Sequence, residues 1–199
     1  MIKILQKGEG DKILRAEAKE IPVKDIVSSP IKKIIKEMSL ALRSQDDAVA
    51  IAAPQIGYSL AIFVVAGKVF SEDFLKDENE KTKDEINSTP KNKKMPPDAV
   101  FINPKITKLS KEKEWTPEGC LSVRWLYGKH LRSKKASVSA YDENGNKFVR
   151  GASGLLAQIF QHETDHLKGV LFIDDAIEVR EEEPIVEKKK KKWKIEIQK

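Results

Sequence analysis

The segment Gln161-His162-Glu163-Thr164-Asp165-His166 places two histidines four residues apart, with a glutamate directly after the first. On an α-helix, residues i and i+4 share one face, so both imidazoles can bind a single metal ion. Glu163 lies beside that face, where its carboxylate can take a proton from a metal-activated water. A helix with two structural or solvated histidines is the alternative, but two of the chain's three histidines fall in this pattern. We therefore interpret the segment as part of a metal site.

The residues around this segment favour a helix from Ser153 to Leu167. Ser153 offers an N-terminal cap, and Gly169 offers a stop just beyond the last turn. A second amphipathic helix is predicted over Pro30–Gln45, where proline suits the first turn. Both segments repeat apolar residues at helical spacing.

Short strands are predicted between and after these helices. Leu60–Val65 is a short apolar run typical of a buried strand, and Ala99–Ile102 is predicted to be a strand that ends at Asn103-Pro104. Val138–Tyr141 and Lys147–Val149 flank a turn-rich stretch and predict a hairpin. Together these elements predict an α+β fold of mixed, mainly antiparallel strands around a central helix that carries the histidines.

A catalytic metal site of this kind needs three protein ligands and an open position for water. The extended protease pattern would place a third histidine at position 172, where this chain has Phe172. Glu178 is conceivable but lies at no characteristic spacing. Cys120 is the better candidate, although a lone cysteine is usually a small buried hydrophobic residue. Because the histidine pair lacks a ligand, we interpret Cys120 as the third.

Three segments of the chain share the order and separations of one enzyme family. They are Ala48-Val-Ala-Ile-Ala-Ala-Pro-Gln55, Glu118-Gly-Cys-Leu-Ser122 and Gln161-His-Glu-Thr-Asp-His166. With these motifs the chain resembles peptide deformylase over most of residues 1–175. The resemblance implies an α+β metallo-hydrolase with strands around the histidine-bearing helix.

The resemblance also implies the reaction, which is removal of the formyl group from the N-terminal formyl-methionine of nascent polypeptides, with release of formate. It assigns Cys120, His162 and His166 to the metal. The family implies Fe²⁺ as the native ion, readily exchanged for Zn²⁺, Ni²⁺ or Co²⁺, whereas a Cys-His-His set alone suggests zinc. We expect iron to be the physiological ion, and zinc can take its place in purified protein.

The same resemblance assigns the groups that act on the substrate. Glu163 is the proton acceptor, and the side-chain amide of Gln55 and the backbone N–H of Leu121 stabilise the developing oxyanion. An apolar pocket for the methionine side chain is expected beside the metal, although ordinary core packing explains its candidate residues equally well. The expected substrate contacts are Val49, Ala50, Glu118, Gly119 and Leu155, and Ile159 is a further candidate for the pocket.

Three positions depart from the family pattern. Ala48 and Ala50 stand where the family has glycine, and a methyl group there would cost about 1–2 kcal/mol if φ were positive, or would only narrow the cleft. Arg124 stands where proline is common; it could meet a peptide at the cleft rim, but a solvated surface arginine is the favoured interpretation. Because of these departures, one alternative is a degenerate, weakly active or inactive homologue that serves as a binding module. A metalloprotease that cleaves internal peptide bonds is a further alternative.

The charge of the chain is concentrated at one end. The formal net charge is +6, and residues 188–199 contain seven lysines and one glutamate, so residues 1–187 are neutral. We expect a catalytic domain over 1–187, with a charged insertion at about 71–98, followed by a lysine-rich tail. The tail is either a solvated run or an electrostatic tether to ribosomal RNA. A balanced domain does not predict DNA binding.

The sequence also bears on compartment. Met1–Gly10 lacks the charged and apolar regions of a secretory signal, and the longest apolar run, Leu60–Ala66, is too short to span a bilayer. We therefore expect a cytoplasmic protein without membrane association. One cysteine excludes a disulfide within the chain.

Overall fold

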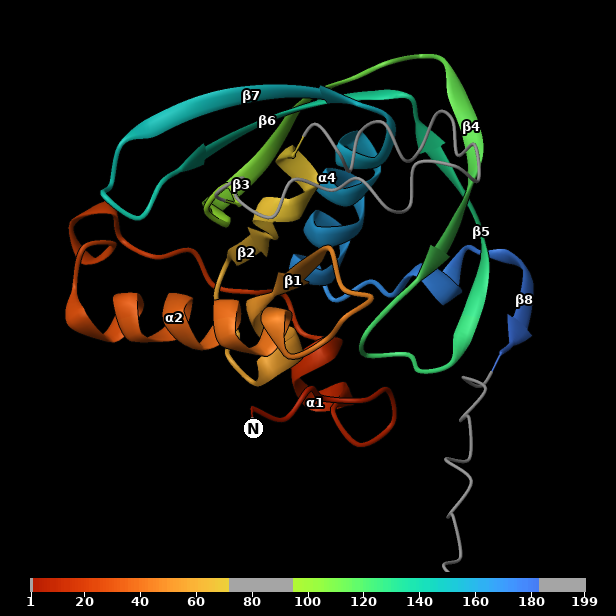
Figure 1. Cartoon of the computed structure of the whole chain (residues 1–199), viewed down its shortest axis with the longest axis horizontal. Helices are drawn as coiled ribbons and strands as arrows, with labels where there is room; N and C mark the ends of the chain where they lie inside the picture. The colour runs from red at the N-terminus through yellow and green to blue at the C-terminus, as the bar shows by residue number, and fades with distance from the viewer. Residues whose placement is uncertain (1, 72–94, 183–199) are drawn as a thin grey trace, which may run out of the picture.

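The computed structural model describes residues 2–71 and 95–182 of the 199-residue chain (Figure 1). Its α-helices and 3₁₀ helices are α1 (Asp11–Leu14), η1 (Val23–Asp25), α2 (Ser29–Arg43), η2 (Ala53–Ile56), η3 (Gly67–Phe70), α4 (Gly154–Leu167) and η4 (Phe172–Asp174). Its strands are β1 (Ala50–Ala52), β2 (Ile62–Val65), β3 (Ala99–Leu109), β4 (Lys113–Gly119), β5 (Leu126–Ser133), β6 (Lys135–Tyr141), β7 (Lys147–Ser153) and β8 (Ile177–Glu181).

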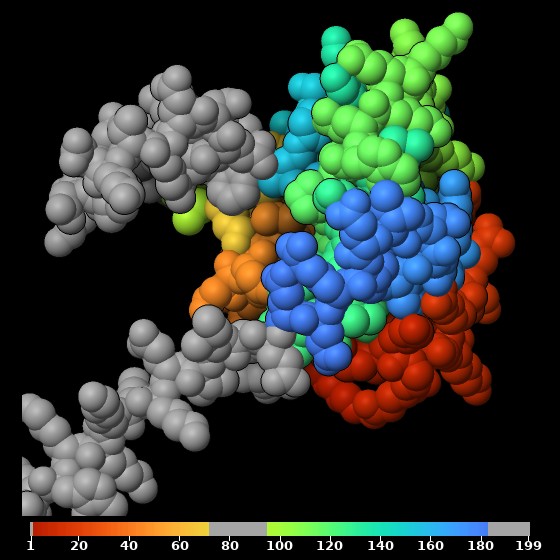
Figure 2. Space-filling model, turned by 90° about the vertical axis from the view of Figure 1, so that its right-hand side faces the viewer, coloured from red at the N-terminus to blue at the C-terminus, as the bar shows by residue number. Residues whose placement is uncertain are grey.

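The strands form two antiparallel sheets. One has five strands in the order β1-β2-β3-β6-β7, and the other has three in the order β4-β5-β8. In Figure 2 the three-stranded sheet, in green and blue, lies above the red N-terminal segment. The predicted α+β class with mainly antiparallel strands is confirmed, as is the hairpin, which β6 and β7 form around residues 142–146.

Strand β2 is apolar on both faces because a helix packs on each side of it. Ile62 and Val64 face one hydrophobic cluster together with the buried side chains of α2, whereas Phe63 and Val65 face a second cluster that contains Phe160 of α4. A strand buried on both faces shows no apolar-polar alternation, which explains the continuous run predicted at Leu60–Val65.

Helix α4 packs against strands of both sheets, in contact with β1, β2, β3, β5, β6 and β7. Its ring Phe160 meets Phe101 edge-on, with centroids 5.2 Å apart, and Phe63 stacks on Phe101 at 4.5 Å. Burial of aromatic rings in such pairs contributes more than area alone. The packing fixes the rotation of the helix and therefore the direction in which its histidines point.

Strand β3 does not end at Asn103-Pro104, contrary to the prediction. It continues to Leu109, with a register shift against β6 between Ile102 and Lys105. The irregularity accommodates a proline that has no N–H for the ladder. Asn103 adopts φ 49°, and its side chain replaces the lost pairing by exchanging hydrogen bonds of 2.8 and 2.7 Å with the backbone of Ile21.

Several predictions fall outside the described residues. Most of the expected insertion at 71–98 and the whole lysine-rich tail lie there, so the boundaries of the catalytic domain stay a prediction. Within the described ranges, no helix has the length and apolarity needed to cross a membrane.

Helix α4 ends at the predicted glycine. Gly169 has φ 74°, its N–H bonds the carbonyl of His166 at 3.1 Å, and the N–H of Val170 bonds the carbonyl of Asp165 at 3.0 Å. This is the Schellman arrangement, in which a left-handed residue satisfies the last helical carbonyls. A Cβ at Gly169 would lie 2.5 Å from the carbonyl oxygen of Arg15.

We expect Gly169→Ala to lower the free energy of unfolding by more than the roughly 1–2 kcal/mol that a left-handed residue costs alone, because the methyl group also meets the Arg15 carbonyl. Chemical denaturation measures this. Gly8→Ala is the matched control, since Gly8 has φ 88° and open space around its Cβ. Equal losses in the two variants would contradict the role of the close approach.

Candidate metal centre and active site

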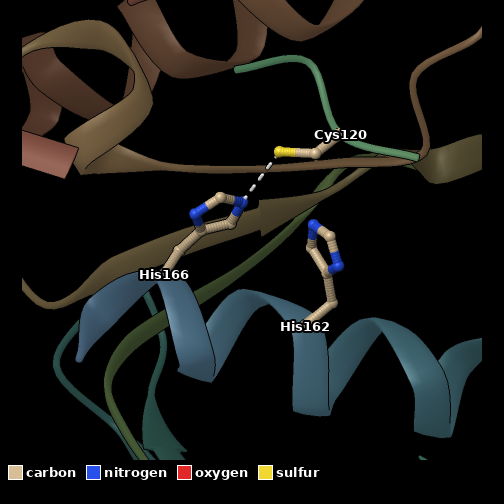
Figure 3. Close-up of side chains that lie close together, drawn as sticks. All are labelled: Cys120, His162 and His166. Carbon is tan, nitrogen blue, oxygen red and sulfur yellow. Dashed lines mark hydrogen bonds between the residues drawn. The ribbon is translucent and has the colours of Figure 1, made fainter. Parts of the chain in front are cut away.

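The three predicted metal ligands come from two elements. His162 and His166 project from one face of α4, and Cys120 lies on the loop directly after β4, facing them (Figure 3). The thiol sulfur of Cys120 is 3.2 Å from Nε2 of His166. One ligand atom of each residue lies within 4.8 Å of the other two.

These side chains have the composition and spacing that a divalent ion requires. An ion about 2.0–2.3 Å from imidazole nitrogen and thiolate sulfur needs its ligand atoms gathered closely, as they are here. Nδ1 of His162 is engaged by Glu118 at 3.0 Å, which leaves Nε2 directed to the site. A histidine ligand fixed by a carboxylate through its other nitrogen is the usual arrangement at metal sites. The residues therefore fit a metal.

The carboxylate that orients His162 is itself held in the interior. Glu118 accepts two hydrogen bonds from Arg132, at 2.7 and 3.0 Å, and both side chains are buried. Arg132 also donates to Asp165 of α4 at 2.5 Å. Burial alone would raise the pKa of Glu118, but the bonds from His162 and Arg132 outweigh it and lower that pKa to about 2. Glu118 is therefore a permanent anion behind the histidine.

Burial favours the protonated form of both Cys120 and Glu163, but the net shift of the pKa differs between them. Burial would raise the pKa of the Cys120 thiol, but the charges of His166 and His162 dominate and lower it to about 5. The pKa of Glu163 is raised, chiefly by burial. Its Oε2 is buried without a hydrogen-bond partner in the described structure. The site thus favours a thiolate ligand and a carboxylate with free proton-accepting capacity.

Gln55 reaches the same site from the first motif. Its Oε1 accepts a hydrogen bond from the N–H of Ala52 at 2.8 Å, which turns its Nε2 toward Cys120 and Ser122, at 3.5 and 3.3 Å. Leu121 follows the thiol, and its carbonyl accepts a 2.9 Å bond from the side chain of Gln6. Both predicted oxyanion donors therefore belong to residues held in place beside the ligands.

A cavity of about 300 Å³ opens in front of the ligands. It is lined by all the predicted substrate-contact residues, namely Val49, Ala50, Glu118, Gly119, Leu155 and Ile159, together with Glu163 and Gln55. Trp125 and Tyr127, which the sequence analysis did not single out, also line it. Ring atoms of Tyr127 would lie 2.7 Å from a Cβ at Gly119, so this wall requires glycine.

The two alanines that stand in place of glycine, Ala48 and Ala50, have ordinary negative φ angles. Among the described non-glycine residues, positive φ occurs at Asn103 and Glu178, and not at Ala48 or Ala50. Both alanines are buried and line the cavity. Their methyl groups therefore narrow the cleft without forcing the backbone.

Arg124 is not the solvated surface arginine that was favoured from the sequence. Its guanidinium binds Asp47 through two hydrogen bonds, of 2.5 and 3.1 Å, and lies 4.5 Å from the ring centroid of Trp125. Only 17% of the side chain is exposed. The arginine is largely covered because an aspartate 77 positions earlier and the adjacent Trp125 ring contact it.

Sequence reasoning also missed Arg132. An arginine near the end of a strand gives no local signal for burial, and its partners Glu118 and Asp165 are 14 and 33 residues away. Only the meeting of β4, β5 and α4 makes it part of the site.

We expect Arg132→Ala to destabilise the protein by about 3–5 kcal/mol, because it leaves the Glu118 carboxylate buried without its cation. Chemical denaturation at neutral pH measures this. Lys134→Ala, two residues on, removes the exposed partner of Glu112 and should have little effect. A similar small loss in both variants would contradict the structural role of the buried pair.

Comparisons with known proteins place these features in one group. The family model described as polypeptide deformylase matches residues 1–182. Peptide deformylase 2 of Clostridium acetobutylicum is 35% identical, over 82% of this chain and 89% of that protein. The Borreliella burgdorferi peptide deformylase is 36% identical, over 81% of both proteins.

Solved structures agree with this result. The peptide deformylase of Synechococcus elongatus in complex with actinonin has a TM-score of 0.67 and 30% identity, covering 88% of this chain and 79% of that one. The Met-Ala-Ser-bound class I type b enzyme of Acinetobacter baumannii has a TM-score of 0.68 and 26% identity, covering 87% and 98%. The chain belongs to the peptide deformylase family.

Proposed function

We propose that this protein hydrolyses the formyl group from the N-terminal formyl-methionine of nascent polypeptides and releases formate. The proposal rests on one observation above others: Cys120, His162 and His166 gather around one point, and Glu163 lines the cavity in front of them. A metal held by such ligands acts as a Lewis acid and activates water as a nucleophile. Three protein ligands leave a coordination position open, as a catalytic site needs.

Glu163 is the proposed base. Its unpartnered Oε2 is free to take a proton from the attacking water, and its raised pKa makes the protonated form accessible. It then gives that proton to the departing amine nitrogen, so formate leaves and the methionine amine is freed. A general acid–base group works best when its pKa lies near the working pH.

Gln55 and Leu121 are the proposed donors to the formyl oxygen as negative charge develops on it. The amide of Gln55 is held by the N–H of Ala52, so its orientation need not be established during the reaction. The peptide group that carries the Leu121 N–H is held by the 3.1 Å hydrogen bond from the N–H of Val123 to the carbonyl of Cys120. Donors fixed before the reaction stabilise the charge without reorganising, which is the basis of oxyanion stabilisation.

The apolar part of the cavity is the proposed methionine pocket. Val49 and Leu155 are half-buried, Ile159 is buried, and all three line the cavity beside His162. An unbranched thioether side chain suits such a pocket because it adapts to irregular apolar walls.

Iron is the proposed physiological ion, with zinc, nickel or cobalt able to replace it in purified protein. The proposal extends to a catalytic domain over 1–187, a cytoplasmic location, and ribosome association through the lysine-rich tail. The match to the polypeptide deformylase family model over residues 1–182, and to relatives named peptide deformylase, supports this function over a binding module without activity or a metalloprotease.

The direct test is formate release from formyl-Met-Ala by the iron-loaded protein. We expect release with the wild type, and loss of both bound metal and release with Cys120→Ala. A metalloprotease that does not use Cys120 would instead keep its metal and its cleavage of internal peptide bonds in that variant. Bound metal without formate release in the wild type would contradict the proposed function.

Glu163→Gln separates the base from the ligands. We expect this variant to keep its metal and to lose about 10²–10⁴-fold in turnover, because the amide cannot accept the proton. Metal analysis and formate release measure the two properties. Asp165→Asn makes the same chemical change two residues along α4, at a side chain that binds Arg132, and should reduce turnover far less. Equal effects would remove Glu163 from its assigned role.

A further inference from the structure

Arg124 joins the two walls of the cleft. One wall is the segment from Asp47 to Ala50, which leads into β1 and contains Ala48. The other is the loop that carries Cys120, four residues before Arg124. The guanidinium spans them with two bonds to the Asp47 carboxylate and a third, of 3.1 Å, to Oε1 of Gln45. Asp47 and Arg124 both line the cavity that contains Glu163.

Other contacts hold the Cys120 loop without reaching the β1 wall. The N–H of Lys7 donates to the carbonyl of Ser122 at 2.7 Å, and the N–H of Glu182 donates to the carbonyl of Trp125 at 2.9 Å. Gln55 does join the two walls, beside Cys120 itself. Arg124 therefore provides a second connection between the walls, further along the loop.

The geometry of this connection is well fixed. Two parallel N–H···O bonds between arginine and a carboxylate set orientation as well as distance. The guanidinium also lies over Trp125, whose ring lines the same cavity. The bond from Arg124 lowers the pKa of Asp47, so the aspartate remains ionised at neutral pH.

We propose that Arg124 and Asp47 are positioning residues that set the width of the cleft for the peptide chain following formyl-methionine, and so determine the KM for formyl peptides. The inference rests on the proposed function and adds to it. The guanidinium hydrogen bonds of Arg124 run to Asp47 and Gln45, and its backbone N–H donates to Gln6 at 3.4 Å. None of these bonds runs to the candidate ligands or to Glu163, so we expect the chemical step not to depend on the pair. A change in substrate binding with unchanged turnover appears in KM alone.

The test is a double-mutant cycle of Arg124→Ala and Asp47→Ala in the iron-loaded full chain, with formyl-Met-Ala-Ser as substrate. Each single variant should raise KM about fivefold, the size expected for one partly exposed ion pair, with kcat within about twofold of wild type. The double variant should be no worse than either single variant, because one interaction is lost in all three. Metal content should stay the same throughout.

Arg43→Ala is the matched control. Arg43 lies at the end of α2 and pairs with Asp98 at 2.9 Å, but it does not line the cavity. Its KM should equal that of the wild type. If Arg124→Ala does not fold, Arg124→Lys keeps the charge but loses the paired bonds, and should raise KM to a smaller extent.

Unchanged KM in folded variants, or effects that multiply in the double variant, would overturn the proposal. Those results would leave formate release by the wild type intact, so they would not bear on the proposed function. Conversely, a wild type without formate release would contradict the proposed function before the cycle is begun.

Discussion

Arg132 binds Glu118 in the interior, where neither charge is tolerable alone, and this pair connects three parts of the fold. Glu118 also contacts His162 of α4, and Arg132 also donates a hydrogen bond to Asp165 of the same helix. The ends of β4 and β5 and helix α4 are therefore connected at one point. Cys120 lies two residues beyond Glu118, so the same tie sets the thiol opposite the imidazoles.

The aromatic core supports this arrangement from the other side of α4. Phe160 packs on Phe101, and Phe63 packs on Phe101 in turn, which couples the helix to β2 and β3. Strand β2 also pairs with β1, and the 3₁₀ helix η2 that contains Gln55 begins directly after β1. The same sheet therefore positions Gln55. The candidate metal ligands and the proposed oxyanion donor Gln55 thus depend on a common packed core. Close-packed interiors transmit such constraints because they contain few voids.

The departures from the family pattern are accommodated in the walls of the cleft. Ala48 and Ala50 have ordinary backbone conformations, so their methyl groups change only its width. Arg124 gains Asp47 as a partner from the same segment that contains these alanines. Arg124 therefore lies near Ala48 and Ala50 in the cleft, although more than 70 residues separate it from them in the chain.

The sequence by itself determined the local elements and the chemistry of the motif. Helical spacing identified both long helices, and Gly169 marked the end of α4 correctly. The His-Glu-x-x-His pattern predicted two ligands and a base. These features depend on neighbours within a few residues, so their signals are present in the chain. Cys120 required more, since its interpretation came from a missing ligand and from the resemblance.

Tertiary structure alone decided what depends on distant partners. The continuation of β3 through Pro104 depends on Asn103 binding Ile21, 82 residues away, and the burial of Arg132 depends on Glu118 and Asp165. The sequence favoured a surface position for Arg124 because no acidic residue near it in the chain can pair with its guanidinium charge. Buried charges and irregular strands need partners that only folding brings close, because an unpaired polar group in the interior is too costly to persist.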